Sequence, residues 1–210
     1  LVRHGEVHNP EGVLYARLPG FHLNARGRLI AQRVAEHLAG APVADLRSSP
    51  LERATDTMEP IAAVFPEVTV RIDDRLIEAD SLLQGQVFGK HNRAVFDPRN
   101  WPLFRNPARP SWGEPYQRIA ERMLAVIADS ALTAGPGKQS VLVSHQSPIW
   151  TVRRAAEGRS LQNSPLSRHC TLGSITTFHV LEGRIVDVRY AEPARDLLGA
   201  DANRAFSSGD

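Results

Sequence analysis

Arginine and histidine side chains that are far apart in the sequence follow three predicted β-strands. Arg3 and His4 come directly after the first strand, and Arg53 lies shortly after the second. His145 follows an apolar run that is typical of a central strand. Because ligands of parallel sheets bind beyond the carboxyl ends of the strands, we expect these four side chains to converge on one small cleft. Arginine forks bind phosphoryl oxygens and a neutral imidazole nitrogen can attack phosphorus, so the set predicts phosphoryl chemistry.

Alternating strand and helix patterns predict the elements that must position these side chains. Asn24 is expected to cap the first helix, and Ser49 is expected to cap the second, with Pro50 at its first position. Strands that alternate with helices predict an α/β fold, a three-layer α/β/α sandwich with a mainly parallel central sheet. The predicted strands are 1–2, 43–46, 68–72 and 140–143, the predicted helices are 25–39, 50–64, 115–127 and 147–156, and 175–180 pairs with 185–188 as a hairpin.

Residues 79–113 are rich in aromatic residues, Arg, Asn and Pro and show little periodicity. The segment is too long for an ordinary connection, so we expect an inserted lid that overhangs the cleft and sets specificity. Its aromatic side chains either pack the insertion onto the domain or contact substrate, and four of its arginines could recognise a second anionic group. These arginines are Arg93, Arg99, Arg105 and Arg109. The whole chain, 1–210, is expected to form a single domain with a loosely held tail at 193–210.

The composition narrows the class of protein. The 210 residues carry 25 basic and 23 acidic side chains, a net charge of +2, and 42% are hydrophobic, which excludes a disordered or fibrous chain. The arginines are scattered rather than gathered in a basic run, so nucleic acid is not an expected partner. No apolar stretch has the length of a membrane helix and no signal peptide is visible. Together with the single Cys170, this predicts a cytoplasmic protein without a membrane partner.

Four motifs, taken in order, resemble the signatures of a known family. They are Leu-Val-Arg-His-Gly-Glu (1–6), Ser-Ser-Pro-Leu-Glu-Arg-Ala-Thr-Asp-Thr (48–57), Leu-Ile-Glu (76–78) and Val-Leu-Val-Ser-His (141–145). This order resembles the histidine phosphatase superfamily, also called phosphoglycerate-mutase-like. A lone Arg-His-Gly would be weak support, whereas four motifs in the family's order are strong support.

The resemblance implies a role for each matching residue. His4 would be the nucleophile that becomes phosphohistidine, and Arg3, Arg53 and His145 would hold the phosphoryl oxygens. An acid near Glu78 would protonate the leaving oxygen. No metal ion and no cofactor is needed, because fixed cationic donors can stabilise the charge that spreads over the equatorial oxygens.

The physical chemistry of the residues adds two requirements. His4 must keep one ring nitrogen unprotonated, which a hydrogen bond from the other nitrogen to a backbone carbonyl would enforce. The general acid must stay protonated near neutral pH. Glu78 is the favoured acid, but Asp80 and Glu114 are alternatives, and Glu114 could instead complement a helix dipole.

Three further residues are expected to contact the substrate: Asn9, Gly5 and Gln146. Gly5 would let the backbone come close beside the nucleophile. Asn9 falls one residue earlier than the Asn common in the family, and Val7 stands where many relatives carry Thr. Asn9 is therefore either a phosphate donor or a turn-forming residue.

Other enzyme classes do not fit the motifs. The zinc-protease pattern needs Glu directly after the first His, where this chain has Gly5, and the zinc-deaminase pattern needs two further cysteines. The Gly-x-Ser-x-Gly elbow of a serine hydrolase is absent. We therefore expect a metal-independent phosphatase acting on a small phosphorylated substrate. The alternatives are a mutase that returns the phosphoryl group to its substrate and a non-catalytic phospho-ligand-binding protein; the sequence leaves the oligomeric state open.

Overall fold

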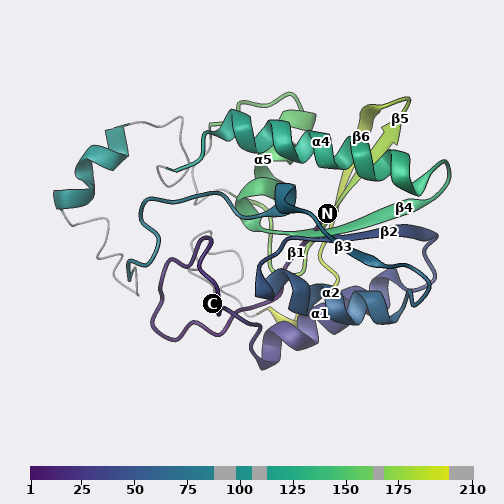
Figure 1. Cartoon of the computed structure of the whole chain (residues 1–210), viewed down its shortest axis with the longest axis horizontal. Helices are drawn as coiled ribbons and strands as arrows, with labels where there is room; N and C mark the ends of the chain where they lie inside the picture. The colour runs from purple at the N-terminus through teal and green to yellow at the C-terminus, as the bar shows by residue number, and fades with distance from the viewer. Residues whose placement is uncertain (88–97, 106–112, 163–167, 199–210) are drawn as a thin grey trace.

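A computed structural model of the chain describes residues 1–87, 98–105, 113–162 and 168–198. Its centre is a six-stranded sheet with the strand order β3-β2-β4-β1-β5-β6 (Figure 1). Strands β1 to β4 form parallel pairs, whereas β5 runs antiparallel to β1 and β6 antiparallel to β5. The predicted α/β class with a mainly parallel sheet is confirmed. The strands are β1 (Val2–Arg3), β2 (Val43–Ser48), β3 (Val70–Ile72), β4 (Gln139–Ser144), β5 (Ile175–Leu181) and β6 (Arg184–Ala191).

Helices cover both faces of this sheet, as Figure 1 shows. Leu142 of β4 packs into the core on the α4–α5 side, whereas its neighbours Val141 and Val143 pack into the core on the α1–α2 side. Because successive side chains of a strand point to opposite faces, a strand covered on both faces is apolar throughout. The helices are α1 (Ala25–Leu38) and α2 (Glu52–Ala63) on one face and α4 (Tyr116–Ala134) and α5 (Gln146–Ala156) on the other.

Local signals set several of the element limits. The Asn24 side chain accepts a hydrogen bond from the Gly27 N–H at 2.7 Å, so α1 begins at the predicted cap. Helix α4 continues past residue 127, the last residue of the predicted helix, and ends at Ala134. Gly135 follows as the C-cap, and its φ of 80° stops the helix. The predicted hairpin turns at Glu182 and Gly183, both at positive φ.

The predicted start of the second helix is wrong. Neither Ser49 nor Pro50 begins α2; its N-cap is Leu51 and its first residue is Glu52. The Ser49 N–H still donates to the Val143 carbonyl of β4 at 3.0 Å, so Ser49 continues the sheet rather than entering the helix. The Ser49 hydroxyl instead forms a hydrogen bond with the His145 ring.

The base of the predicted insertion is tightly joined. The Glu114 N–H donates to the Asp80 carbonyl at 3.3 Å. Gly113 packs against the same carbonyl so closely that a Cβ at this position would collide with it. Leu83, just inside the insertion, is 1% exposed. The segment that leaves the domain after Asp80 therefore returns to it at Gly113.

The interior of the insertion is described only in part. A 3₁₀ segment, η2 (Pro98–Arg105), carries Arg99 on the surface. Residues 88–97 and 106–112, with Arg93 and Arg109, lie outside the described residues, so a lid role stays a prediction.

The beginning of the tail is packed against the domain. A short 3₁₀ segment, η5 (Arg195–Leu197), follows Ala194, which is 1% exposed. Leu197 and Leu198 pack against the buried Ile30 of α1. Residues 199–210 lie outside the described part of the chain, and the loose attachment expected for 193–210 is not tested there. Among the described helices, none has the length and apolar character to span a membrane.

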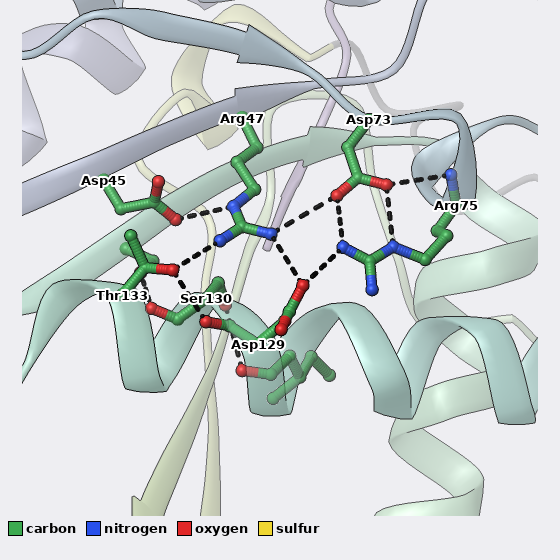
Figure 2. Close-up of polar contacts among 9 residues, drawn as sticks. Asp45, Arg47, Asp73, Arg75, Asp129, Ser130 and Thr133 are labelled. Carbon is green, nitrogen blue, oxygen red and sulfur yellow. Dashed lines mark hydrogen bonds and ion pairs between the residues drawn. The ribbon is translucent and has the colours of Figure 1, made fainter.

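An ionic network joins the sheet to α4, as Figure 2 shows, and it is buried at Asp45 and Arg47. The Arg47 guanidinium of β2 donates to Asp45 at 2.7 Å and to Thr133 of α4 at 2.9 Å. It also pairs with Asp73 at 3.3 Å. Asp73 accepts two hydrogen bonds from the Arg75 guanidinium and one from the Arg75 N–H, and these bonds hold the pKa of the Asp73 carboxyl below its usual value. The network fixes the chain just before Glu78 against α4.

We expect Arg47→Met to lower the free energy of unfolding by about 3–5 kcal/mol, because it leaves the buried Asp45 carboxylate without its partner. Urea unfolding monitored by circular dichroism measures the change. Arg33→Met is the matched control, since Arg33 pairs with Glu36 and Asp196 on the surface; it should cost less than about 1 kcal/mol. Equal effects of the two variants would contradict the buried-network interpretation.

Candidate active site

His4 lies where β1 ends, with its backbone N–H bonded to the Ser144 carbonyl of β4 at 3.1 Å. Its side chain is buried, and ring nitrogen Nδ1 lies 2.7 Å from the Gly5 carbonyl oxygen. A carbonyl oxygen can only accept, so Nδ1 carries the proton and Nε2 keeps its lone pair. His4 thus has the hydrogen bond from a ring nitrogen to a backbone carbonyl that a nucleophilic histidine was expected to need.

The surroundings of His4 keep the ring neutral. Burial lowers the pKa of His4 well below its ordinary value, and the positive charges of Arg53 and Arg3 lower it further. Near neutral pH the unprotonated Nε2 is thus available to attack an electrophile.

Two glycines bring the His4 loop against α1. A Cβ at Gly5 would lie 2.5 Å from the Gly27 carbonyl oxygen, and a Cβ at Gly27 would collide with the Glu6 backbone. The Gly5 N–H donates to the Thr57 hydroxyl of α2 at 3.0 Å. The close backbone approach at Gly5 is thus made to α1, and a contact between Gly5 and substrate stays a prediction.

Arg53 of α2 is fully buried beside His4. Its Nη2 donates to the Ala16 carbonyl at 2.5 Å, and its guanidinium lies 4.5 Å from the centre of the Tyr15 ring. Nε and Nη1 have no hydrogen-bond partner among the described residues. Burial lowers the pKa of Arg53, while the charges of nearby groups, Glu78 among them, oppose this shift.

Arg3 presents a further donor in the same place. Its Nη1 donates to the Cys170 carbonyl at 2.7 Å, which fixes the guanidinium, whereas its Nε is buried without a partner in the described structure. The Arg3 backbone is held as well: its N–H donates to Ser174 and its carbonyl accepts from Gly173. The loop before β5 therefore anchors Arg3 at both ends.

His145 completes the cluster at the end of β4. Its ring centre lies 5.1 Å from that of His4, and its Nε2 lies 2.8 Å from the Ser49 hydroxyl oxygen. Nδ1 is buried and has no partner among the described residues. Burial lowers the pKa of His145 well below its ordinary value, and the charges of Arg53, His4, Arg122 and Arg3 add to the effect.

The four predicted side chains are thus brought together by three adjacent strands and the start of α2. Their buried nitrogen atoms without partners in the described chain are Arg3 Nε, Arg53 Nε and Nη1, and His145 Nδ1. Buried donors are normally satisfied, and leaving several unsatisfied is costly. An anion with several acceptor oxygens, such as a phosphoryl group, would satisfy them together.

The three candidate acids differ in their surroundings. Glu78 is half-buried, its Oε1 accepts the Ala79 N–H at 2.7 Å, and its charge acts on Arg53. Asp80 is exposed. Glu114 forms ion pairs of 3.0 Å with both Arg17 and Arg122, so its carboxylate is committed to holding the base of the insertion. Of the three, Glu78 is the carboxylate whose charge acts on Arg53 of the cationic cluster.

The other expected substrate contacts have partners within the protein. The Asn9 side-chain amide donates to the Val13 carbonyl at 2.9 Å, and its oxygen accepts the Val13 N–H at 3.0 Å, which is turn chemistry. The Gln146 amide donates to the Cys170 carbonyl at 3.4 Å. Substrate contacts by either side chain stay predictions.

Comparison with known proteins supports the family resemblance. The family model for the histidine phosphatase superfamily (branch 1) matches residues 1–193. The chain belongs to this superfamily. It is 46% identical over 194 residues to an uncharacterised protein of Mycobacterium tuberculosis (strain H37Rv), a match that covers 92% of this chain and 95% of that protein.

Some of the other proteins that are similar to this chain have a named activity. The solved structure of mycobacterial glucosyl-3-phosphoglycerate phosphatase has a TM-score of 0.69 and 24% identity, covering 90% of this chain and 94% of that one. The 2,3-bisphosphoglycerate-dependent phosphoglycerate mutase of Thermoplasma acidophilum is 38% identical over 79 residues, which are 37% of this chain and 39% of that protein. The proteins that are similar to this chain thus include a phosphatase and a mutase.

Several residues that support this candidate site were not singled out by sequence reasoning. The Cys170 carbonyl anchors both Arg3 and Gln146, and Thr57 bridges Gly5 to the Arg53 carbonyl. Arg17 donates to the Glu78 carbonyl at 2.7 Å and pairs with Glu114. Thr57 stands in the 48–57 motif and Ser49 was expected only as a cap, whereas nothing local marks Arg17 or Cys170.

The two buried histidines of this member of the histidine phosphatase superfamily make its stability depend on pH. The folded-state pKa values of His4 and His145 lie well below the ordinary 6.5, so the unfolded chain binds these two protons first as the pH falls. We therefore expect the free energy of unfolding to fall as the pH drops below about 6.5, by up to about 1.4 kcal/mol per pH unit for each histidine.

Urea unfolding at pH 8, 6 and 5 measures this loss. The variant His4→Gln/His145→Gln removes both titrating groups, so the loss between pH 8 and pH 5 should be smaller than in the unaltered protein. The same loss in both proteins would show that other groups cause the pH dependence.

Proposed function

We propose that the protein is a metal-independent phosphatase that hydrolyses a small phosphomonoester through a phosphohistidine on His4. The observation that carries this proposal is the combination of a nucleophile and an anion site. The Nε2 lone pair of His4 is made available by the Nδ1 bond to Gly5, and buried arginine and histidine donors surround it. A site for binding alone would not require the oriented, neutral nucleophile.

In the first step the Nε2 lone pair of His4 forms a bond to phosphorus while the bond from phosphorus to the leaving oxygen breaks. Arg3, Arg53 and His145 donate to the equatorial oxygens, where negative charge is spread in the transition state. Because these side chains are fixed by Cys170, Ala16 and Ser49, little reorganisation is needed. The protonated Glu78 carboxyl gives its proton to the leaving oxygen, which departs as an alcohol.

In the second step water attacks the phosphorus of the phosphohistidine. The Glu78 carboxylate takes the proton of the water as the bond between phosphorus and Nε2 breaks. Inorganic phosphate is released and the neutral His4 ring is restored. The half-buried position of Glu78, which borders both the cationic cluster and the surface, supports access of water to this carboxylate.

We expect His4→Ala to lower kcat by at least about 10³-fold while the fold survives, since the variant lacks the nucleophile. The measurements are release of inorganic phosphate from a panel of phosphosugars, phosphoglycerates, nucleotides and phosphopeptides, and circular dichroism. Brief exposure of the unaltered protein to a labelled substrate should leave acid-labile, alkali-stable label, and a chelator should not abolish activity.

Undiminished phosphatase activity of His4→Ala would overturn the proposal. An isomerised phosphoester formed in place of inorganic phosphate would point to a mutase. Tight binding of phosphorylated compounds without any turnover would point to a non-catalytic binding protein.

We expect Glu78→Gln to slow hydrolysis of alkyl phosphates by at least about 10²-fold but to slow p-nitrophenyl phosphate much less. The nitrophenolate leaves without a proton, so an acid that protonates the leaving oxygen matters little for it. Comparing initial rates of the two substrates under single-turnover conditions makes the measurement. Asp80→Asn serves as the control, because Asp80 is exposed. A uniform loss for both substrates would contradict the role of Glu78 as the acid.

A further inference from the structure

The Ser49 hydroxyl lies between β2 and the second histidine of the site. Its oxygen is 2.8 Å from His145 Nε2, and both side chains are fully buried. The position of Ser49 is fixed from three directions. Its N–H donates to the Val143 carbonyl at 3.0 Å, its carbonyl accepts the Ser48 hydroxyl at 2.9 Å, and its own oxygen accepts a long bond of 3.4 Å from the Leu51 N–H.

The direction of the hydrogen bond between Ser49 and His145 follows from this arrangement. Among the described residues, no acceptor other than His145 Nε2 is recorded for the Ser49 hydroxyl proton. A buried hydroxyl that kept its proton unused would lose a hydrogen bond. The hydroxyl therefore donates, and Nε2 accepts through its lone pair.

A neutral imidazole carries one proton, so a lone pair on Nε2 places that proton on Nδ1. The groups on other elements whose charges act on His145 are Arg3 at the end of β1, His4 directly after it, Arg53 on α2 and Arg122 on α4. Burial of the ring and these groups together lower the pKa of His145, which disfavours the form with both nitrogens protonated. Nδ1 is also the nitrogen that is buried without a partner in the described structure.

Resting on the proposed function, we propose that Ser49 is a positioning residue that holds His145 in the Nδ1–H tautomer, so that the neutral ring donates a hydrogen bond to the phosphoryl group. In the other tautomer, Nδ1 would direct a lone pair at an anionic oxygen and repel it. The tautomer thus decides whether His145 helps or opposes phosphoryl binding. The role of Ser49 is to fix one of two forms that are otherwise interchangeable.

The first experiment reads the tautomer directly. Two-dimensional NMR of protein labelled with ¹⁵N at histidine reports which ring nitrogen carries a proton. We expect Nδ1–H for His145, both alone and with inorganic phosphate. A proton on Nε2, or on both nitrogens with phosphate bound, would overturn the proposal. This measurement needs neither turnover nor a variant, so it is independent of whether the protein is a phosphatase.

The second experiment compares Ser49→Ala with Ser49→Thr and Ser130→Ala. Ser49→Thr keeps the hydroxyl, and Ser130→Ala removes another buried serine, whose hydroxyl donates to the Ile127 carbonyl within α4. We expect Ser49→Ala to lose the Nδ1–H preference and to bind inorganic phosphate about tenfold more weakly by calorimetry, about the effect of one hydrogen bond to a charged group. Ser49→Thr should restore both properties, and Ser130→Ala should leave both unchanged.

Steady-state kinetics separates positioning from structural support. Removing a donor that acts on the phosphoryl charge should lower kcat more than it raises KM. An unchanged tautomer and unchanged phosphate affinity in Ser49→Ala would overturn the proposal. A correct tautomer in a protein that binds no phosphate and releases none would instead refute the proposed function and leave the tautomer assignment standing.

Discussion

The site depends on one constraint: positively charged and polar nitrogen atoms are buried, and the described part of the chain leaves several of them without a hydrogen-bond partner. Arg53 is fully buried, yet two of its three nitrogens find no partner in the described structure. Such a group is costly to desolvate, so the surrounding fold must be stable enough to hold it. The apolar cores on both faces of β4 provide that stability, and the strand ends direct the donors to one point.

The sequence was most informative where chemistry and secondary structure coincide. Arg3, His4 and His145 could be placed together because each lies at the end of a strand or directly after it, and strands of a parallel sheet end at the same edge. Asn24 could be recognised as a cap because its side-chain oxygen accepts the N–H of Gly27, only three residues further along the chain. The positions of such residues follow from the strand or helix to which they belong and from neighbours close in the sequence. Motifs and hydrophobic periodicity are therefore enough to predict them.

The rest of the site depends on contacts between distant segments. Ser49 has a side chain that is common at helix caps, but its hydroxyl forms a hydrogen bond with His145, which lies 96 positions away in the sequence. Glu114 precedes a helix and could have complemented its dipole, whereas two arginines claim it as a partner. Arg47 on a central strand is buried because carboxylates from β2, from the turn after β3 and from α4 meet it. The local sequence around these residues does not predict any of these contacts.

The closed base of the insertion has a consequence for how such an enzyme can diversify. Since Gly113 and Glu114 meet the Asp80 carbonyl, the chain between them begins and ends at nearly the same point. The entropy of closing a loop grows only slowly with its length, so residues can be added or removed there at little thermodynamic cost. Glu78 and its support by Arg17 stand outside that loop. The length of this segment can therefore change in evolution without displacing Glu78 or the arginine that supports it.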